Sequence, residues 1–268
     1  MKTRILTGVV SAIAFIVILL LPPMVFTVAL GIVGLVMLYE CYMATKATGK
    51  EKGVGYFCAI LLMISAYGIV KLKNTTYFPW DVVFVCAVVF TVLSHMIIVV
   101  KEHGNRTYAD VLSNGFLTVY IVMSVISIFV IKESFGTLSM LVLFICAWGT
   151  DTFAYFGGRF FGKHKLIEHV SPKKTVEGAI IGGIGAMVLC ALYMFYINNM
   201  QTAILLNGAI IGVIGSVFSQ IGDLSASAIK RDAGIKDFGT IFPGHGGFLD
   251  RFDSVIYIAP LVCLLLHM

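Results

Sequence analysis

Residues 203–229 read AILLNGAIIGVIGSVFSQIGDLSASAI, and they contain both the signal for the fold and the first sign of a site. A helix needs about 17–25 mostly apolar residues to cross the hydrocarbon core of a bilayer, and this run is long enough. Asp223 is its only ionisable residue. Because a charge near the bilayer centre costs at least ~2.5–3.5 kcal/mol, a transmembrane helix with a functional polar side chain is predicted here.

The same kind of apolar run recurs along the whole chain. Hydrophobic residues make up 59% of the 268 residues and charged residues 12%, whereas soluble domains carry roughly 25% charged residues. We therefore expect an all-α integral membrane protein with about nine transmembrane helices. Besides 203–229, the predicted spans are 5–21, 24–43, 54–72, 80–100, 109–131, 137–156, 176–197 and 254–267.

The connections between these runs differ in their content of Lys and Arg. If the nine runs alternate in direction, all but three of the 19 Lys and Arg residues fall on one side, the exceptions being Lys71, Lys73 and Lys132. Cytoplasmic loops of membrane proteins carry such an excess. We therefore predict a multi-pass protein of the cell membrane, with its N-terminus and both long polar connections in the cytoplasm. The net charge of +5 is interpreted as topology and not as nucleic-acid binding.

One face of the helix predicted at 203–229 is polar along its length. At 100° per residue, its polar residues share a sector of roughly 80–100°. A seam of hydrogen bonds to another helix is one interpretation, but an acid and a lysine on the same face favour a polar cavity that opens to the cytoplasm between the C-terminal helices. The residues of this face are Ser216, Ser219, Gln220, Asp223, Ser227 and Lys230.

A glycine-rich, charged segment follows that helix. Glycines concentrated between Gly234 and Gly247 exclude a helix and allow the backbone to close on a ligand. Carboxylates with only His245 nearby suit Mg²⁺ better than zinc, and the six cysteines are scattered singly. Interspersed Lys and Arg suit phosphate oxygens. Together they predict phosphoryl or nucleotidyl transfer, with simple salt bridging as the alternative.

A second polar segment lies between Asp151 and Gly178. Its GGRFFGKH sequence at 157–164 approaches a P-loop, but His164 replaces the required Ser or Thr and no strand is predicted before it, so an ATPase is rejected. Ser171-Pro172 is interpreted as a helix start with Lys173 and Lys174 in its first turn. The helix dipole disfavours cations there, which suggests that these lysines bind an anion.

Small residues recur in the two helices that flank this region. Their spacing of about four residues is typical of membrane helices that approach each other closely, so we predict tight packing. They are Gly178, Gly182, Gly183 and Gly185 in one run, and Gly208, Gly212, Gly215 and Ser216 in the next.

The segment 227–253, SAIKRDAGIKDFGTIFPGHGGFLDRFD, resembles the signature of the phosphatidate cytidylyltransferases, or CDP-diacylglycerol synthases. SPKKTVEG at 171–178 is also similar to bacterial members. The resemblance implies that CTP and phosphatidic acid form CDP-diacylglycerol and pyrophosphate with Mg²⁺ in phospholipid biosynthesis. Because the N-terminal half has little polar content within its spans, we expect scaffold helices (1–135) and a catalytic region (136–268) within one membrane domain. A second cation and a homodimer are left open.

The resemblance implies roles for individual residues. Asp223 and Asp250 are expected to bind the metal, and Asp151, Asp237 and Asp253 to orient neighbouring side chains. Two alternatives remain within enzymes, a CTP-dependent lipid-alcohol kinase and a cytidylyltransferase for another lipid phosphate. A remote alternative is a secondary transporter with Asp151, Glu177 and Asp223 on its ion path. The expected catalytic residues are Asp223, Ser227, Lys230, Arg231, Lys236, Asp250 and Arg251; the expected substrate-binding residues are Lys173, Lys174, Lys230, Arg231, His245, Gly246, Gly247 and Arg251.

Overall fold

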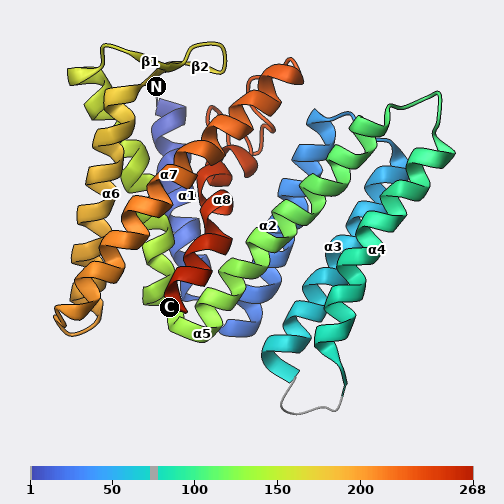
Figure 1. Cartoon of the computed structure of the whole chain (residues 1–268), viewed down its shortest axis with the longest axis horizontal. Helices are drawn as coiled ribbons and strands as arrows, with labels where there is room; N and C mark the ends of the chain where they lie inside the picture. The colour runs from blue at the N-terminus through green and yellow to red at the C-terminus, as the bar shows by residue number, and fades with distance from the viewer. Residues whose placement is uncertain (1, 73–77, 268) are drawn as a thin grey trace. The chain divides into compact units, whose positions relative to one another are not determined.

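A computed structural model describes residues 2–72 and 78–267 of the chain (Figure 1). Lys73, which was counted in the prediction of membrane topology, lies outside the described residues. The chain is built almost entirely from helices. In order, the elements are α1 (Lys2–Leu20), α2 (Pro23–Ala44), α3 (Gly49–Tyr67) with a π-helical turn (Gly68–Leu72), α4 (Trp80–Lys101), α5 (Tyr108–Phe161), β1 (Lys165–Ile167), β2 (Ser171–Thr175), α6 (Val176–Ile197), α7 (Ala203–Asp232) and α8 (Leu249–Leu266).

The helices confirm the predicted fold class, an all-α integral membrane protein. Each predicted apolar run lies in helical structure, except that 5–21 and 254–267 each extend one residue past the end of their helix. In the described part of the chain, six helices are long and apolar enough to cross a membrane, with α3 counted through Leu72. One of them, α5, covers two predicted runs because its 54 residues continue through Gly136, where φ is 82° and the helix kinks. The number of nine spans stays a prediction.

The chain divides into two compact units, each of which is described by itself. Unit 1 comprises residues 1–129 and the segment Asp237–Asp250, and unit 2 comprises Val130–Lys236 and Arg251–Met268. The segment Asp237–Asp250 thus packs with the N-terminal helices, although it lies in the C-terminal half of the sequence. The predicted functional division at residue 135 stays a prediction.

Unit 1 contains a buried polar network among its apolar helices. Helices α3 and α4 run side by side (Figure 1). Glu51 on α3 is fully buried, yet it accepts hydrogen bonds from Asn114 Nδ2 and from Thr48 Oγ1, the latter at 3.1 Å, and pairs with Arg106 Nε at 3.4 Å. The partners explain why the carboxylate is tolerated there, since a buried charge is stable only when paired and hydrogen-bonded.

Unit 2 is organised around the antiparallel pair α6 and α7, which lie side by side in Figure 1. The small residues predicted to allow close packing do so. A Cβ on Gly212 would lie 2.5 Å from Met187 Cα, and one on Gly208 would lie 2.7 Å from Cys190 O. Because both neighbours are backbone atoms that cannot rotate away, only glycine fits at these two positions, and the packing prediction is confirmed.

The segment before α6 differs from its prediction. Ser171-Pro172 does not begin a helix; it begins strand β2, which pairs antiparallel with β1. Helix α6 begins at Val176, and its N-cap is Thr175, whose Oγ1 accepts the Gly178 N–H at 3.1 Å. Thr is a favoured N-cap residue. The inference that Lys173 and Lys174 lie in the first helical turn was therefore wrong, and both lie in β2.

Glu177 secures the hairpin to α6. It accepts the Lys163 N–H at 3.0 Å and bonds His164 Nδ1 at 2.6 Å. The Lys165 ammonium donates to Pro172 O at 2.5 Å, from β1 to β2. Of the residues that approach a P-loop in sequence, 157–161 thus end α5, and only 162–164 lead into the hairpin.

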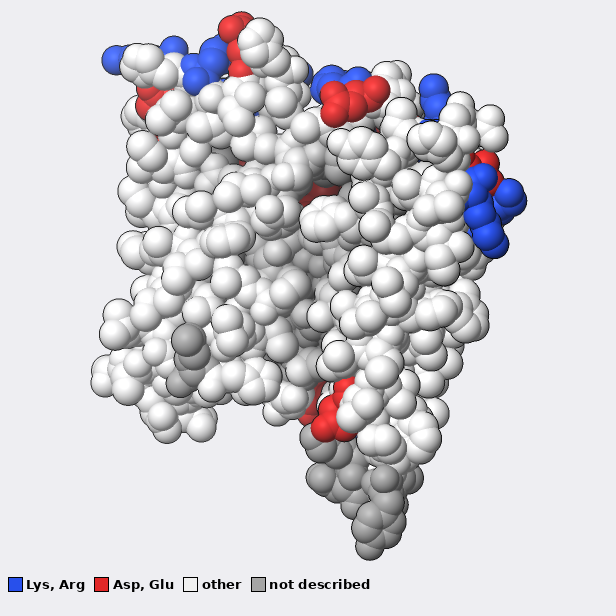
Figure 2. Space-filling view, turned by 45° about the vertical axis from the view of Figure 1, so that its right-hand side comes forward, with Lys and Arg blue, Asp and Glu red and all other residues white. Residues whose placement is uncertain are grey.

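The flanks of the helices have the surface that a lipid environment requires. Figure 2 shows them largely free of Lys, Arg, Asp and Glu, with the charged side chains gathered mainly toward helix ends. Large apolar side chains are exposed there, for example Val85 at 61% and Leu192 at 57%. A soluble protein rarely exposes an apolar surface this extensive.

Candidate functional site

The polar face of α7 has two parts with different surroundings. Toward the middle of the helix, Ser216 is buried, and Gln220 Nε2 donates to Ala179 O of α6 and to Ser216 O, both at 3.3 Å. This part of the face therefore forms hydrogen bonds to another helix, which was one of the two interpretations drawn from the sequence. The part nearer the C-terminal end of α7 is charged and meets other charges of unit 2.

Those charges form what we call the carboxylate cluster, comprising Asp151, Lys174, Asp223, Lys230 and Asp253. Asp223 interacts electrostatically with both Asp151 and Asp253, while Lys174 acts on Asp151 and Lys230 on Asp253. The five side chains come from α5, β2, α7 and α8. Three acids and two lysines are thereby gathered from segments distant in sequence.

Lys174 makes the closest contact in the carboxylate cluster, an ion pair between its Nζ and Asp223 Oδ2. Both side chains are 25% exposed, so the pair is neither fully solvated nor sealed from water. Neighbouring side chains of a strand point to opposite faces, and Lys173 is exposed. Of the two predicted anion-binding lysines, Lys174 therefore reaches the cluster.

Asp253 and Asp151 are both linked to Ser254. The Ser254 N–H donates to Asp253 Oδ1 at 2.8 Å, and Asp151 forms a side-chain hydrogen bond with Ser254. Both acids were predicted to orient neighbours, and they do lie beside Asp223. The hydrogen bonds to Ser254 help to hold two like charges near a third.

The segment Asp237–Asp250, which we call the signature loop, forms a tight turn in unit 1. The Phe242 N–H donates to Gly246 O at 2.9 Å, and the His245 N–H donates to Phe242 O at 2.8 Å. Gly244 and Gly246 have φ values of 78° and 82°, which favour glycine. His245 is half-buried and lies near α1, since a Cβ on Gly8 would be 3.9 Å from its ring.

Asp250, at the end of this loop, is 9% exposed. Its Oδ2 accepts two backbone hydrogen bonds, from Phe238 N at 2.7 Å and from Gly247 N at 3.0 Å. This carboxylate therefore ties the beginning of the signature loop to its end.

Glu40 on α2 is a buried acid of the same region that sequence reasoning missed. It is 2% exposed, and it accepts hydrogen bonds from Phe248 N and Leu249 N of the signature loop. The available signal was a lone carboxylate within the apolar run 24–43, since such residues are usually functional or paired.

The predicted site residues differ in their exposure and in the unit to which they belong. Asp223 and Asp250 belong to different units, so their joint binding of one metal ion stays a prediction. Ser227 on α7 is half-buried. The exposed predicted site residues are Asp151, Lys173, Arg231, Lys236, Asp237 and Arg251.

The acids of unit 2 fit the ligand preference of Mg²⁺. Among residues 2–72 and 78–267, no three His, Cys, Asp or Glu side chains are arranged as the ligand set of one ion. Mg²⁺ is commonly held by only one or two carboxylates, with water and substrate phosphates as its other ligands. Asp223, within reach of Asp151 and Asp253, can supply such carboxylate oxygens, and a bound cation would compete with Lys174 for Asp223.

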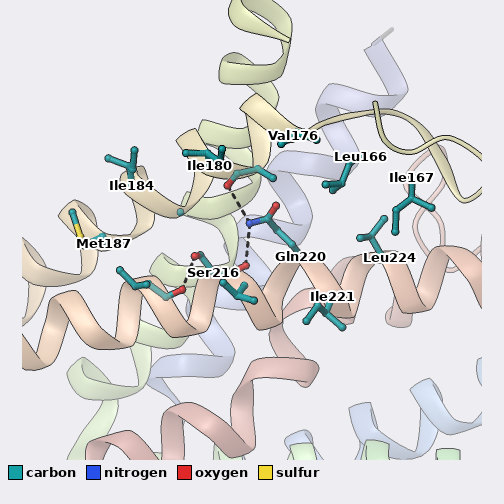
Figure 3. Close-up of a pocket in the computed structure, with 14 residues that line it drawn as sticks. Leu166, Ile167, Val176, Ile180, Ile184, Met187, Ser216, Gln220, Ile221 and Leu224 are labelled. Carbon is teal, nitrogen blue, oxygen red and sulfur yellow. Dashed lines mark hydrogen bonds between the residues drawn. The ribbon is translucent and has the colours of Figure 1, made fainter. Parts of the chain in front are cut away.

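An apolar groove of about 500 Å³ runs between α6 and α7 in unit 2 (Figure 3). It is lined by aliphatic side chains of both helices and by Leu166 and Ile167 of the β-hairpin. Gln220 lies in its wall, with its amide bonded across to α6 in Figure 3. The groove differs in character from the predicted polar cavity, which stays a prediction.

Comparison with known proteins extends the similarity over the entire chain. The model of the family described as "Cytidylyltransferase family" matches residues 2–268. A phosphatidate cytidylyltransferase of Staphylococcus aureus (strain COL) is 35% identical over 273 residues, covering 99% of each chain. The Bacillus subtilis (strain 168) enzyme of the same name is 34% identical, covering 99% of this chain and 97% of its own. The Thermotoga maritima enzyme of that name is 27% identical, covering 97% and 94%.

Proposed function

Because the chain belongs to the cytidylyltransferase family, we propose that it transfers a cytidylyl group from CTP to phosphatidic acid, giving CDP-diacylglycerol and pyrophosphate. The similar proteins of known name are phosphatidate cytidylyltransferases, and they match nearly the whole length of this chain. The observation that carries the proposal is the carboxylate cluster, in which three acids and two lysines converge in a membrane protein.

The reaction is an in-line displacement at phosphorus. A phosphate oxygen of phosphatidic acid attacks the α-phosphorus of CTP, forming a new P–O bond, and the bond from the α-phosphorus to the oxygen bridging to the β-phosphorus breaks. Pyrophosphate leaves with the electron pair of that bond. The attacking phosphate is already ionised near neutral pH, so the protein's task is to position the two substrates and to stabilise charge.

The chain's own residues divide these tasks. Lys174 and Lys230 each interact with an acid of the carboxylate cluster. Their ammonium groups are therefore close to the proposed metal ligand and are proposed to bind phosphate oxygens there. When a triphosphate enters, the Lys174 ammonium exchanges Asp223 for a phosphate oxygen. The exposed Lys173, Arg231, Lys236 and Arg251 add positive charge that attracts CTP and the lipid headgroup.

Asp223 is the proposed metal ligand of unit 2, with Asp151 and Asp253 beside it. Asp250 is proposed as the second ligand, on the basis of the sequence signature. When bound, Mg²⁺ would neutralise phosphate charge and polarise the phosphorus. Asp237, His245, Gly246 and Gly247 are proposed to shape the substrate-binding face of the signature loop.

The apolar groove between α6 and α7 suits the lipid substrate. Its lining offers aliphatic contacts along two membrane helices, and it ends near the β-hairpin that carries Lys174. We assign it to an acyl chain of phosphatidic acid. This assignment agrees with a multi-pass protein of the cell membrane whose N-terminus and active site face the cytoplasm, where CTP is present.

One assay separates this reaction from its nearest alternative. Purified protein in detergent with phosphatidic acid and Mg²⁺ is given CTP labelled at either the α- or the γ-phosphate. Cytidylyl transfer predicts that α-label enters the lipid and that γ-label leaves as pyrophosphate. γ-Label in a lipid product, with diacylglycerol or another lipid alcohol as acceptor, would instead identify a CTP-dependent kinase and refute the proposal.

A further inference from the structure

The N-terminal helix α2 contributes a carboxylate to the signature loop of unit 1. Glu40 Oε1 accepts the Phe248 N–H at 3.0 Å, and Glu40 Oε2 accepts the Leu249 N–H at 2.8 Å. The two segments are separated by more than 200 residues of sequence. Both oxygens of a side chain that is only 2% exposed are thus bonded to the loop.

The loop backbone is shaped around this carboxylate. A Cβ on Gly247 would lie 2.1 Å from Glu40 Oε1, and one on Gly239 would lie 2.4 Å from the same oxygen. For both glycines the three nearest atoms all belong to Glu40. Neither glycine is required by a positive φ, so the reason for their small size is the carboxylate of Glu40.

Glu40 also accepts a hydrogen bond from a backbone N–H group at the start of α8. The first N–H groups of a helix have no partner within it, and a negative charge is favourable there. Leu249 is the first residue of α8, and its N–H is bound by Glu40. One acceptor for the start of α8 is therefore supplied by a distant helix.

Two acids together bind four backbone N–H groups of the loop. Glu40 binds the N–H groups of Phe248 and Leu249, and Asp250 binds those of Phe238 and Gly247. The two carboxylates are close enough for the charge of Asp250 to act on Glu40. Without Glu40, the backbone beside Asp250 would lose two of these bonds and its fixed orientation.

We propose that Glu40 is a positioning residue, which holds the signature loop so that its backbone and the Asp250 carboxylate keep the geometry that the reaction needs. Its importance for catalysis rests on the proposed function, whereas its hold on the loop does not. Misplacement of a catalytic group by about 1 Å can cost about 100-fold in rate. We therefore expect Glu40→Ala to lower kcat about 100-fold, and Glu40→Gln, which can accept only one of the two N–H groups, to lower it about tenfold.

The first test measures the hold on the loop directly. Hydrogen exchange followed by mass spectrometry is compared between the wild type and Glu40→Gln. Glu102→Gln is the control, because Glu102 is a carboxylate of the same unit that pairs with the exposed Lys50. Faster exchange confined to peptides that contain Phe248 and Leu249 supports the proposal. Unchanged exchange there, or the same increase in Glu102→Gln, overturns it.

The second test uses the fit between Glu40 and Gly247. Gly247→Ala places a methyl group on the carboxylate, and Glu40→Asp withdraws the carboxylate by one methylene. If Glu40 acts through the loop, the double variant should be at least as active as the less active of the two single variants, Gly247→Ala and Glu40→Asp. Losses that multiply, as for independent sites, would overturn the proposal. Gly53→Ala, where a Cβ meets nothing within 4 Å, controls for adding a methyl group.

The third readout is the Mg²⁺ dependence of activity. A misplaced Asp250 binds metal more weakly, so Glu40→Gln should need more Mg²⁺ for half-maximal rate and should recover part of its activity at high Mg²⁺. A lower rate with an unchanged Mg²⁺ requirement would assign Glu40 a structural role and overturn the proposal. A wild type without cytidylyltransferase activity would refute the proposed function, while hydrogen exchange would still decide whether Glu40 holds the loop.

Discussion

Replacing Lys174 should reverse the sign of the effect that Asp223→Asn has on the stability of the protein. In unit 2, Lys174 pairs with Asp223 Oδ2, and Asp223 repels Asp151 and Asp253. In the wild type, Asp223→Asn loses the ion pair but also relieves that repulsion. In a Lys174→Met background only the relief remains, so there Asp223→Asn should raise stability.

The size of the effect follows from the exposure of the pair. Exposed ion pairs contribute about 0–1 kcal/mol, and breaking a fully buried pair costs about 3–5 kcal/mol. With both side chains 25% exposed, Lys174→Met should cost about 1–3 kcal/mol, between those limits. At about 2–4 °C per kcal/mol for a chain of this size, the apparent Tm should fall by a few degrees to about 10 °C.

Thermal unfolding in one detergent, at one scan rate and at neutral pH, measures the four proteins of this double-mutant cycle. Lys173→Met is the matched control, because Lys173 is the exposed neighbour in the same strand, and its Tm should stay near that of the wild type. Asp223→Asn should raise the Tm of Lys174→Met. An equal loss of Tm from Asp223→Asn in both backgrounds would refute the electrostatic account of the cluster.

Three further outcomes are expected. Gly212→Ala should cost about 1–3 kcal/mol by overpacking, since its Cβ would meet backbone of α6; an unchanged Tm, as expected for Gly53→Ala, would contradict the packing account. Arg106→Ala should cost about 3–5 kcal/mol because it leaves the buried Glu51 without its cation, and failure of added Glu51→Gln to restore the Tm would count against that reason. Ala179→Leu narrows the apolar groove and should therefore raise the ratio of the KM for long-chain phosphatidic acid to the KM for short-chain phosphatidic acid. The expected rise is about fourfold for each methylene group excluded from the groove, at about 0.8 kcal/mol each. An equal change of KM for both lipids would remove the acyl-chain assignment.

The membrane fold could be predicted because continuous apolar runs are a strong local signal. Gly136 lies between the predicted runs 109–131 and 137–156, but the sequence could not show that α5 would continue through it with only a kink. The β-hairpin was missed because β1 has three residues and β2 has five, too few to display alternation. Thr175 as N-cap was obscured by Ser171-Pro172, an equally good helix start in local terms.

The candidate site was predictable where charges interrupt apolar runs. Asp223, Asp151 and Asp253 were all identified, but their mutual proximity depends on how α5, α7 and α8 pack. Glu40 could not be connected with the signature loop, because no spacing relates two segments so far apart in the chain. The N-terminal helices were interpreted as scaffold, and only the folded structure reveals that α2 bonds to the loop.

The central claim, that chemistry takes place at the carboxylate cluster, is tested most directly by transfer of α-label from CTP to lipid in Asp223→Asn. The variant must elute and melt as a folded protein, and Ser225→Ala, a neighbour on α7, serves as the control. The account predicts that Asp223→Asn loses about 100-fold or more of the rate, since removing one group that stabilises transition-state charge commonly costs that much, while Ser225→Ala keeps it. Wild-type transfer by folded Asp223→Asn would contradict it.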